Sequence, residues 1–520
     1  MSGSIPTGPF TMPMYREGVP KFIRPWLYLL FLFFFELAGC VYLGSASSIV
    51  GSTGLTSHDV MFIGLCNVVG VNMPFPLLFR FKFRFTNHQL LINAALVIAL
   101  CNFLALYTTS VPVLAVLSFF AGFFKLCGTF ECASNIQLWM APGRDFQIFF
   151  PILYIVVVGD IFLQGWMTGI VTYYFQDWQM MNWLIIGLML SVALMVFILT
   201  KNFRFMKPLP LISVDWLGGI LWSALMMEVI FLFEYGEYYN WADGCEWRMG
   251  VVFFIVTLAL TLWRERKIRH PYISLEAFRY KTLVPLLALF FVAEWLNTTP
   301  KVLQNAFTGD IEHWGMLTNA HLQLFGWVGT ILGCLFTLYW CKVLRQKYTR
   351  LLIIGGIALV AYQVMMYFYI APNLPLEYLY FPLILQAFGY AIYFTALTIY
   401  LEELMPFHHF FMGLTISGLV RNGPVESIMS GIYSFGIRHH IADATAIGIQ
   451  WDPQQIMMIA IKQLFGVTSI LGIAFLIALM LYDLQPVRST LKKIPSWFSV
   501  GKGVMKDVSE VISRHKRDDK

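Results

Sequence analysis

Ionisable side chains lie inside long apolar stretches of this sequence, where each needs a physical reason to be present. They are Glu36, Lys125, Glu131, Asp160, Glu228, Glu234, Glu294, Arg421 and Glu426. A charge at the centre of a bilayer costs at least about 2.5–3.5 kcal/mol on insertion scales, so such residues are usually functional or paired with one another. Acids outnumber bases in this set, which predicts that some acids lack a basic partner.

A carboxyl group that can hold either a proton or a cation is what proton-coupled chemistry in a membrane requires. We predict this proton-coupling role for Glu36, Glu131, Asp160 and Glu294. The alternative is that these acids only join helices through hydrogen bonds, or stay protonated and inert. Near the C-terminus, Arg421 and Glu426 flank Pro424, and interrupted helices mark binding sites in transporters. Both residues are therefore predicted substrate or gating residues, with simple charge pairing to another helix as the alternative.

Composition identifies the class of fold that must position these residues. The chain has 520 residues, of which 58% are hydrophobic and only 12% charged, whereas soluble domains carry roughly 25% charged residues. Backbone polar groups in lipid need internal partners, so each apolar run is expected to be a helix. The runs predict an all-α polytopic membrane protein with about fourteen transmembrane helices, at residues 26–48, 58–79, 88–108, 111–138, 148–174, 180–200, 214–235, 249–263, 282–299, 319–341, 351–371, 377–401, 408–436 and 463–483.

The charges of the loops predict the orientation. With the N-terminus inside, most of the 35 Lys and Arg residues fall in cytoplasmic segments, and the outer loops hold only Arg248, Lys301, Arg438 and Lys462. This asymmetry follows the positive-inside rule and predicts a bacterial inner-membrane protein with both termini in the cytoplasm. It also assigns the net charge of +6 to one membrane face, so no nucleic-acid partner is expected. The basic tail could lie on anionic membrane lipid.

Three stretches resemble a known family. They are Asp215-Trp216-Leu217-Gly218-Gly219 followed by Gly236 and Trp241, the run from Pro271 to Arg279 (PYISLEAFR, which includes Phe278), and Gln304 with Gly309. Together they resemble the fourteen-span drug/proton antiporters of the major facilitator superfamily, the EmrB/QacA type. The resemblance implies a major facilitator fold, with two six-helix bundles and two extra central helices.

The same resemblance assigns roles to single residues. Glu36 matches the acid of the family's first span, and Lys125 is the basic residue nearest to its fourth-span arginine. Lys125 and Gln304 therefore join the predicted substrate or gating residues. The fifth span keeps the small residues Gly159, Gly165 and Gly169, which permit close helix packing. The loop after the second span has basic residues but lacks the family's Asp, so the chain resembles a divergent member.

The expected organisation follows from these patterns. Residues 1–25 form a cytoplasmic segment, 26–200 the N-terminal bundle, 201–281 the extra central helices with a cytoplasmic loop, 282–483 the C-terminal bundle, and 484–520 a basic cytoplasmic tail. The expected function is secondary active export of an amphipathic or lipophilic small molecule in exchange for protons, as in drug-resistance efflux. The alternative is a facilitator, or a relative that no longer pumps, without proton coupling.

A membrane-embedded enzyme is a less favoured prediction. Such chemistry needs clustered metal ligands, and the adjacent pairs His408–His409 and His439–His440 cannot share a helix face. The cysteines show no metal or disulfide spacing, so no cofactor and no metal is expected. The resemblance also allows a periplasmic adaptor and an outer-membrane channel as partners, although no residue of this chain points to them directly.

Overall fold

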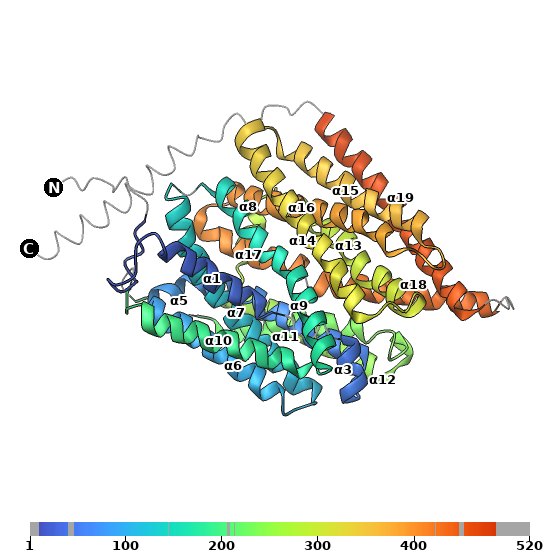
Figure 1. Cartoon of the computed structure of the whole chain (residues 1–520), viewed down its shortest axis with the longest axis horizontal. Coiled ribbons are helices and arrows are strands. Elements are labelled where there is room, and N and C mark those ends of the chain that lie inside the picture. Colours follow the sequence, from blue (N-terminus) through green and yellow to red (C-terminus); the bar gives the residue numbers. More distant parts are fainter. Residues whose placement is uncertain are drawn as a thin grey trace, which may run out of the picture. The chain divides into compact units, whose positions relative to one another are not determined.

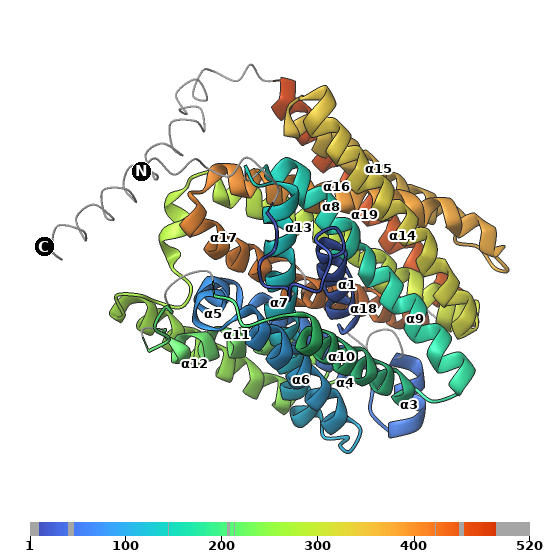
Figure 2. The same ribbon diagram turned by 60° about the vertical axis from the view of Figure 1, so that its left-hand side comes forward.

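The computed structural model describes residues 10–39, 46–143, 145–204, 208–212, 214–421, 423–446 and 452–484. The chain divides into two units, Met1–Leu476 and Ile477–Lys520, and only the first residues of the second unit are described. The described residues form helices and connecting turns, with one isolated β-bridge between Tyr15 and Thr200. Figures 1 and 2 show the helices of the large unit from two directions.

The first part of the chain holds the helices α1 (Arg24–Leu37), α3 (Ala46–Thr53), α4 (Ser57–Asn72), α5 (Leu78–Arg84), α6 (Asn87–Ala105), α7 (Val111–Met140), α8 (Phe146–Val157), α9 (Gly159–Phe175) and α10 (Gln179–Leu199). Side-chain caps fix two of the helix starts, because Thr56 and Thr86 each form a capping box with the third residue of the helix that follows. In both views α1, α6, α7 and α10 lie together (Figures 1 and 2).

The remaining helices are α11 (Trp216–Glu234), α12 (Cys245–Lys267), α13 (Leu283–Thr299), α14 (Met316–Tyr339), α15 (Tyr348–Tyr369), α16 (Tyr380–Leu404), α17 (Phe407–Val420), α18 (Gly423–Ala446) and α19 (Pro453–Leu484). Within this part α16 packs against α14, α15 and α13. The helix α11 packs against α4 on one side and α18 on the other, so it contacts both the early and the late helices. Its neighbour α12 is almost entirely exposed, as expected of a helix that faces lipid.

Twelve described helical segments are long and apolar enough to cross a membrane, which confirms the all-helical, multi-pass fold class. The first and thirteenth predicted spans are not among these twelve because each is broken. The helix α1 ends at Leu37, before the undescribed residues 40–45, and α17 and α18 are separated at Arg421. The exact number of fourteen crossings therefore stays a prediction, as do the boundaries of the predicted bundles.

Several predicted boundaries are wrong. The last span was expected to begin at residue 463, but α19 begins at Pro453, and the four basic residues expected in outer loops (Arg248, Lys301, Arg438 and Lys462) all lie in helical segments.

The ninth span was expected to end at residue 299, with Lys301 in an outer loop, but the helical segment continues from Leu283 to Ile311. After α13 the backbone widens into the π-helical turns Pro300–Gln304 and Phe307–Ile311. Pro300 lacks a backbone N–H and was read as a helix end, yet the wider turns accommodate it. Lys301 consequently lies on a helix, where it can reach the acids of α13 and α18.

Contacts between the early and late helices occur along α9 and α14. A Cβ atom at Gly169 would lie 2.5 Å from the Cβ atom of Ala320, so the backbones approach too closely for a larger residue. This matches the expectation that the small residues of the fifth span permit close packing. A second contact between the early and late helices is aromatic. Phe411 of α17 packs edge-on against Phe79 and Phe130 at centroid distances of 4.7 and 5.6 Å.

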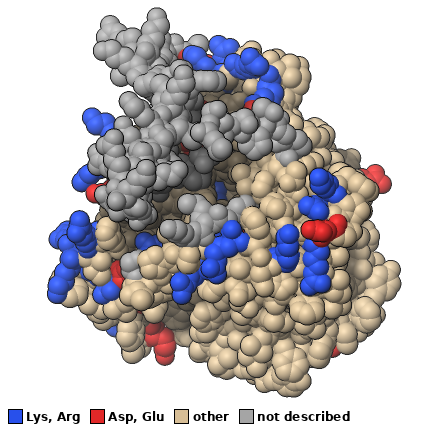
Figure 3. Space-filling model, turned by 90° about the vertical axis from the view of Figure 1, so that its left-hand side faces the viewer, with Lys and Arg blue, Asp and Glu red and all other residues tan. Residues whose placement is uncertain are grey.

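Lysine and arginine side chains gather on the face of the molecule shown in Figure 3, where few acidic side chains are visible. This asymmetry is the structural counterpart of the loop charges. The side of the membrane that this face occupies stays a prediction.

Candidate functional site

The break in the first span creates a polar centre among α1, α7 and α9. The helix α1 stops at Leu37, and the turn that follows supplies the Gly39 N–H to the Glu36 carbonyl at 3.2 Å. The main-chain oxygen of Glu36 accepts a hydrogen bond from Lys125 Nζ at 2.8 Å and another from Gln164 Nε2. A lysine at the C-terminal end of a helix also stabilises the negative end of the helix dipole.

The Glu36 side chain is held at the same place. Lys125 Nζ lies 3.0 Å from Glu36 Oε2, and Thr129 Oγ1 donates to Glu36 Oε1 at 2.9 Å. The two charged side chains are only 12% and 7% exposed, so solvent screens this ion pair weakly. Both partners on α7 lie one turn apart, which fixes the carboxylate by an ion pair and a hydrogen bond.

Asp160 adds a second carboxylate from the first turn of α9. Its side chain is 1% exposed, and it lies close enough to Lys125 and Glu36 to be affected by the charge of both. Gln164 donates to Asp160 Oδ2 at 2.9 Å, whereas Asp160 Oδ1 has no hydrogen-bond partner in the described part of the chain. Lys125 thus pairs with Glu36 and lies within electrostatic reach of Asp160. We call Glu36, Lys125, Asp160 and Gln164 the N-terminal cluster.

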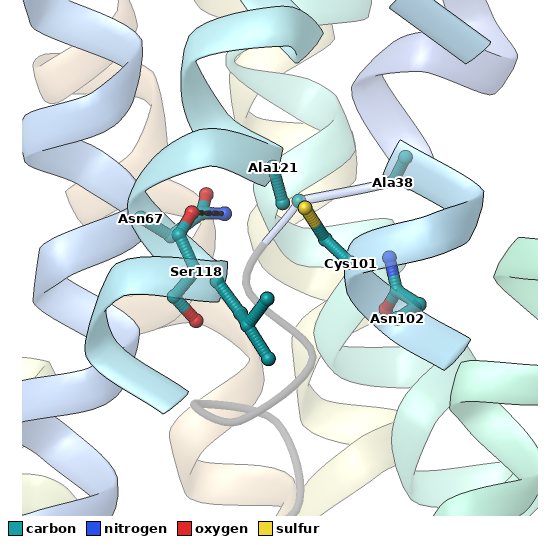
Figure 4. Close-up of a pocket in the computed structure, with 8 residues that line it drawn as sticks. Ala38, Asn67, Cys101, Asn102, Ser118 and Ala121 are labelled. Atoms are coloured by element: carbon teal, nitrogen blue, oxygen red, sulfur yellow. Dashed lines mark hydrogen bonds between the residues drawn. The ribbon is translucent and has the colours of Figure 1, made fainter. Parts of the chain in front are cut away.

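Gly39 and a small cavity complete the surroundings of this cluster. A Cβ atom at Gly39 would lie 2.7 Å from both Lys125 Nζ and Gln164 Nε2, so only glycine lets the chain pass here without displacing them. A cavity of about 20 Å³ is lined by Gly39 itself and by residues that include Ala38, Asn67, Cys101, Asn102, Ser118 and Ala121 (Figure 4). A volume of this size holds about one water molecule.

A second cluster lies among α13, α16 and α18. Lys301 Nζ is 2.7 Å from Glu426 Oε2 and 3.9 Å from Glu294 Oε1, so one lysine serves two acids. Tyr390 of α16 donates to Glu294 Oε2 at 2.9 Å, and Asn297 donates to the other oxygen at 3.4 Å. We call Glu294, Lys301, Tyr390 and Glu426 the C-terminal cluster. It differs from the N-terminal cluster because the side chain of its lysine is 36% exposed.

Arg421 occupies the break between α17 and α18. Its guanidinium carbon lies 4.2 Å from the ring centroid of Phe394 and 5.4 Å from that of Phe290. It is buried, and its Nε and Nη1 atoms have no hydrogen-bond partner among the described residues. The alternative of simple charge pairing with another helix holds for Glu426, which pairs with Lys301, and among the described residues no acid pairs with Arg421.

Two other predicted residues lie outside both clusters. Glu131 forms its own buried ion pair with Lys82 of α5 at 3.2 Å, and Asn135 donates to its other oxygen at 2.9 Å. This geometry fits an acid that joins helices, which was the alternative prediction. Gln304 accepts a hydrogen bond from Tyr362 at 2.8 Å inside an apolar core of the late helices.

The stretches that carry the family resemblance lie at the start of α11 and in the connection between α12 and α13. Asp215 caps the start of α11 by accepting from the Gly218 N–H at 3.0 Å, and it pairs with Arg264 of α12 at 2.6 Å. The neighbouring side chains Trp216 and Phe278 are exposed. After Pro271, in the connection between α12 and α13, Tyr272 donates to the Met73 carbonyl at 2.6 Å, and burial raises the pKa of its phenol, so it remains a donor. Arg279 is 80% exposed and pairs loosely with Glu276 at 3.6 Å.

Sequence reasoning missed several partners in the clusters. Gln164 and Tyr390 are neutral, so the search for charges inside apolar runs passed over their role. Lys301 was assigned to a loop because Pro300 imitates a helix end. Among the described residues, no group of three or more His, Cys, Asp or Glu side chains has an arrangement that could hold a metal ion.

Comparison with known proteins identifies the fold. No family model matches the sequence, and the search of curated proteins gives no match. Among solved structures, a peptide transporter POT in complex with sulfate is 14% identical with a TM-score of 0.58, covering 90% of this chain and 96% of its own. An auto-inhibited POT family peptide transporter is 13% identical with a TM-score of 0.54, covering 89% and 97%. A mutant of the nucleoside transporter NupG is 12% identical with a TM-score of 0.53, covering 87% and 99%.

Similarity at such low identity shows the fold alone. The chain has the major facilitator fold of these transporters, which confirms the expected fold class. The narrower resemblance to the fourteen-span drug/proton antiporters stays a prediction.

Proposed function

We propose that the chain is a secondary active transporter that exchanges protons for an amphipathic or lipophilic small molecule. The observation that carries this proposal is that Lys125, paired with Glu36, is also within electrostatic reach of the buried Asp160 at the break in the first span. Two carboxylates and one ammonium leave a surplus negative charge in a buried place. One proton, or one cation, neutralises that surplus at a far lower energy than leaving it unpaired.

The cluster also has a mechanical connection to the rest of the protein. It joins α1, α7 and α9, and α9 makes the close contact with α14 at Gly169. When a proton neutralises one acid, Lys125 is left to the other acid alone, and the three helices settle in a different arrangement. In this mechanism the α9–α14 contact and the ring contact at Phe411 open in turn, which gives alternating access.

The cellular setting belongs to the same proposal. Loop charges support an inner-membrane location with cytoplasmic termini, and exposed apolar helices such as α12 provide the lipid contact. Export as the direction, and a periplasmic adaptor with an outer-membrane channel as partners, rest on the family resemblance alone. The similar solved structures are described as nucleoside and peptide transporters, which supports transport of small molecules in general.

A facilitator without proton coupling is the second candidate. The observation in its favour is that the Glu36 carboxylate already has an ion pair with Lys125 and a hydrogen bond from Thr129. A carboxylate with such partners can be a static link between helices. The two candidates differ in whether substrate movement carries protons.

The test is proton flux in liposomes that contain the purified protein and a trapped pH-sensitive dye. A proton gradient is imposed, and tetraphenylphosphonium or cholate is added as substrate. We expect substrate-dependent flux in the native protein and its loss in Glu36→Gln and Asp160→Asn. Glu228→Gln is the matched control, because Glu228 is a membrane acid outside both clusters that accepts a hydrogen bond from Thr257 at 2.8 Å.

The possible outcomes separate the candidates. Flux that persists in Glu36→Gln and Asp160→Asn but disappears in Glu294→Gln would move the coupling to the C-terminal cluster. Uptake of substrate without proton flux would establish the facilitator. Equal loss in Glu228→Gln would show that removing any membrane acid damages the protein, and the assignment to the N-terminal cluster would fail.

A further inference from the structure

Arg421 differs from the three lysines of the membrane region that have an acid partner. Lys82, Lys125 and Lys301 each have a carboxylate oxygen within 3.2 Å. Arg421 is 5% exposed and forms no ion pair with any described residue, and two of its guanidinium nitrogens have no hydrogen-bond partner in the described ranges. A buried charged donor without a partner is strongly unfavourable, so it needs an explanation beyond packing.

The surroundings of Arg421 are aromatic and come from different parts of the fold. Phe394 of α16 and Phe290 of α13 face the guanidinium, at 4.2 and 5.4 Å from its carbon to the ring centroids. Tyr154 of α8 packs edge-on against Phe394 at a centroid distance of 4.8 Å. The faces of these rings attract the cation, but they do not accept its N–H groups as a carboxylate would. The guanidinium thus lies against aromatic rings, and its Nε and Nη1 donors have no hydrogen-bond partner among the described residues.

The backbone next to Arg421 adds positive potential. The helix α18 begins at Gly423 and runs for 24 residues, so the positive end of its dipole lies beside Arg421. Pro424 supplies no N–H there, and Glu426 of the same first turn pairs with Lys301, so its carboxylate does not serve Arg421. A guanidinium presents its donors in a planar fork that fits a carboxylate or a similar oxyanion. The helix start and the unused fork therefore favour the same kind of ligand.

We propose that Arg421 binds the acidic group of the transported molecule, and that the substrate class is organic anions with an apolar, aromatic-compatible body. This inference rests on the proposed transport function and names the chemistry of its substrate. The acidic group pairs with the guanidinium beside the start of α18, and Phe290, Phe394 and Tyr154 contact the apolar body. Tyr390, which lies within electrostatic reach of Arg421 and donates to Glu294, connects this position to the C-terminal cluster.

The first test asks whether Arg421 is retained for binding or for stability, and it needs no ligand. Thermal unfolding of the purified protein is compared for Arg421→Met and for Lys82→Met, which removes a buried base that does have an acid partner. We expect Arg421→Met to unfold at the same temperature as the native protein or higher, and Lys82→Met to unfold at a clearly lower temperature. A loss of stability in Arg421→Met as large as in Lys82→Met would overturn the proposal, because Arg421 would then be structural.

The second test measures binding with probes that share one apolar body. The shift of the unfolding temperature is recorded with 4-phenylbutyrate, 4-phenylbutanol and 4-phenylbutylamine, and with cholate as a larger anion. We expect the anions to stabilise the native protein more than the alcohol and the amine do. That difference should vanish in Arg421→Met and be partly kept in Arg421→Lys, which keeps the charge but loses the planar fork.

Two results would overturn the inference. One is an equal stabilisation of the native protein by the anionic, neutral and cationic probes, or none by any anion. The other is an anion effect that survives unchanged in Arg421→Met. Binding is measured without a proton gradient, so the two proposals can fail separately. Anion binding without proton flux would refute the proposed coupling and leave the anion site standing. Proton flux without anion preference would refute the anion site and leave the coupling standing.

Discussion

Removing Lys125 tests the N-terminal cluster most directly. The substitution Lys125→Met keeps the length and the apolar stem of the side chain but removes the charge that lies 3.0 Å from Glu36 Oε2. It leaves Glu36 and Asp160 near one another without a base. Breaking a buried ion pair in this way typically costs about 3–5 kcal/mol, since the remaining charge is uncompensated.

Protonation sets a ceiling on that cost. A glutamate carboxyl in water titrates near pH 4.3, so placing a proton on it at pH 7.5 costs about 4 kcal/mol, at roughly 1.4 kcal/mol per pH unit. The destabilisation at pH 7.5 is therefore expected to be about 3–4 kcal/mol. Because the folded variant then holds one more proton than the unfolded chain, its stability must rise as the pH falls. Lowering the pH from 7.5 to 5.5 should recover about 2.7 kcal/mol of the loss.

The assay is reversible unfolding by sodium dodecyl sulfate in mixed micelles, followed by tryptophan fluorescence at both pH values. The triple variant Glu36→Gln/Lys125→Met/Asp160→Asn is the control, because it removes both acids together with the lysine. We expect the triple variant to be more stable than Lys125→Met at pH 7.5 and to lose most of the pH dependence. A loss below about 1 kcal/mol in Lys125→Met, with no pH dependence, would refute the reasoning that this pair is buried and unscreened.

Other positions give predictions on the same unfolding assay. Gly169→Leu should destabilise the protein by about 1–3 kcal/mol, because even a Cβ atom there would lie 2.5 Å from the Cβ of Ala320. Asp215→Ala should cost about 1–2 kcal/mol, since it removes both the cap of α11 and the ion pair with Arg264. Arg279→Ala should change the stability by less than about 0.5 kcal/mol, because that side chain is 80% exposed and its ion pair is long.

Each of these predictions has a contrary outcome. Unchanged stability in Gly169→Leu would mean that α9 and α14 separate easily from this contact. Equal effects of Asp215→Ala and Arg279→Ala would show that the cap and ion pair at the start of α11 contribute nothing beyond an exposed charge.

Much of the fold could be predicted from the sequence, because lipid imposes strong rules. Backbone groups in a membrane must be satisfied within a helix, so apolar runs of spanning length predict helices with few alternatives. Each predicted span overlaps a described helix, although several ends differ. The predictions that failed concern the ends of individual helices. The ninth span was expected to end at residue 299, and the helical segment continues through wider π turns to Ile311. Pro300 has no N–H for the Leu296 carbonyl, and that carbonyl instead accepts hydrogen bonds from Thr299 at 2.9 Å and from Gln363 at 3.1 Å.

The candidate site was predicted only in part, for a different physical reason. A charge inside an apolar run is visible in a sequence, so Glu36, Lys125 and Asp160 could be named in advance. That these three side chains lie close together could not be predicted, because it depends on which faces of α1, α7 and α9 point at one another. Neutral partners such as Gln164 carry no signal of this kind, since amides inside membrane helices most often join helices.

The two clusters share a pattern that a single cluster would not reveal. Counted along the predicted bundles, Glu36 and Glu294 lie on the first span of each, and Asp160 and Glu426 lie on the fifth. In each cluster two acids lie near one lysine, yet the lysines come from different places, and this makes the clusters unequal. Lys125 is 12% exposed and Lys301 is 36% exposed, whereas the acids are buried in both clusters, with Glu36 at 7%, Glu294 at 2% and Glu426 at 8%. The clusters therefore differ in the exposure of the lysine and not of the acids. Exposure alone does not choose between them, and the proton flux of the Glu36→Gln and Glu294→Gln variants does.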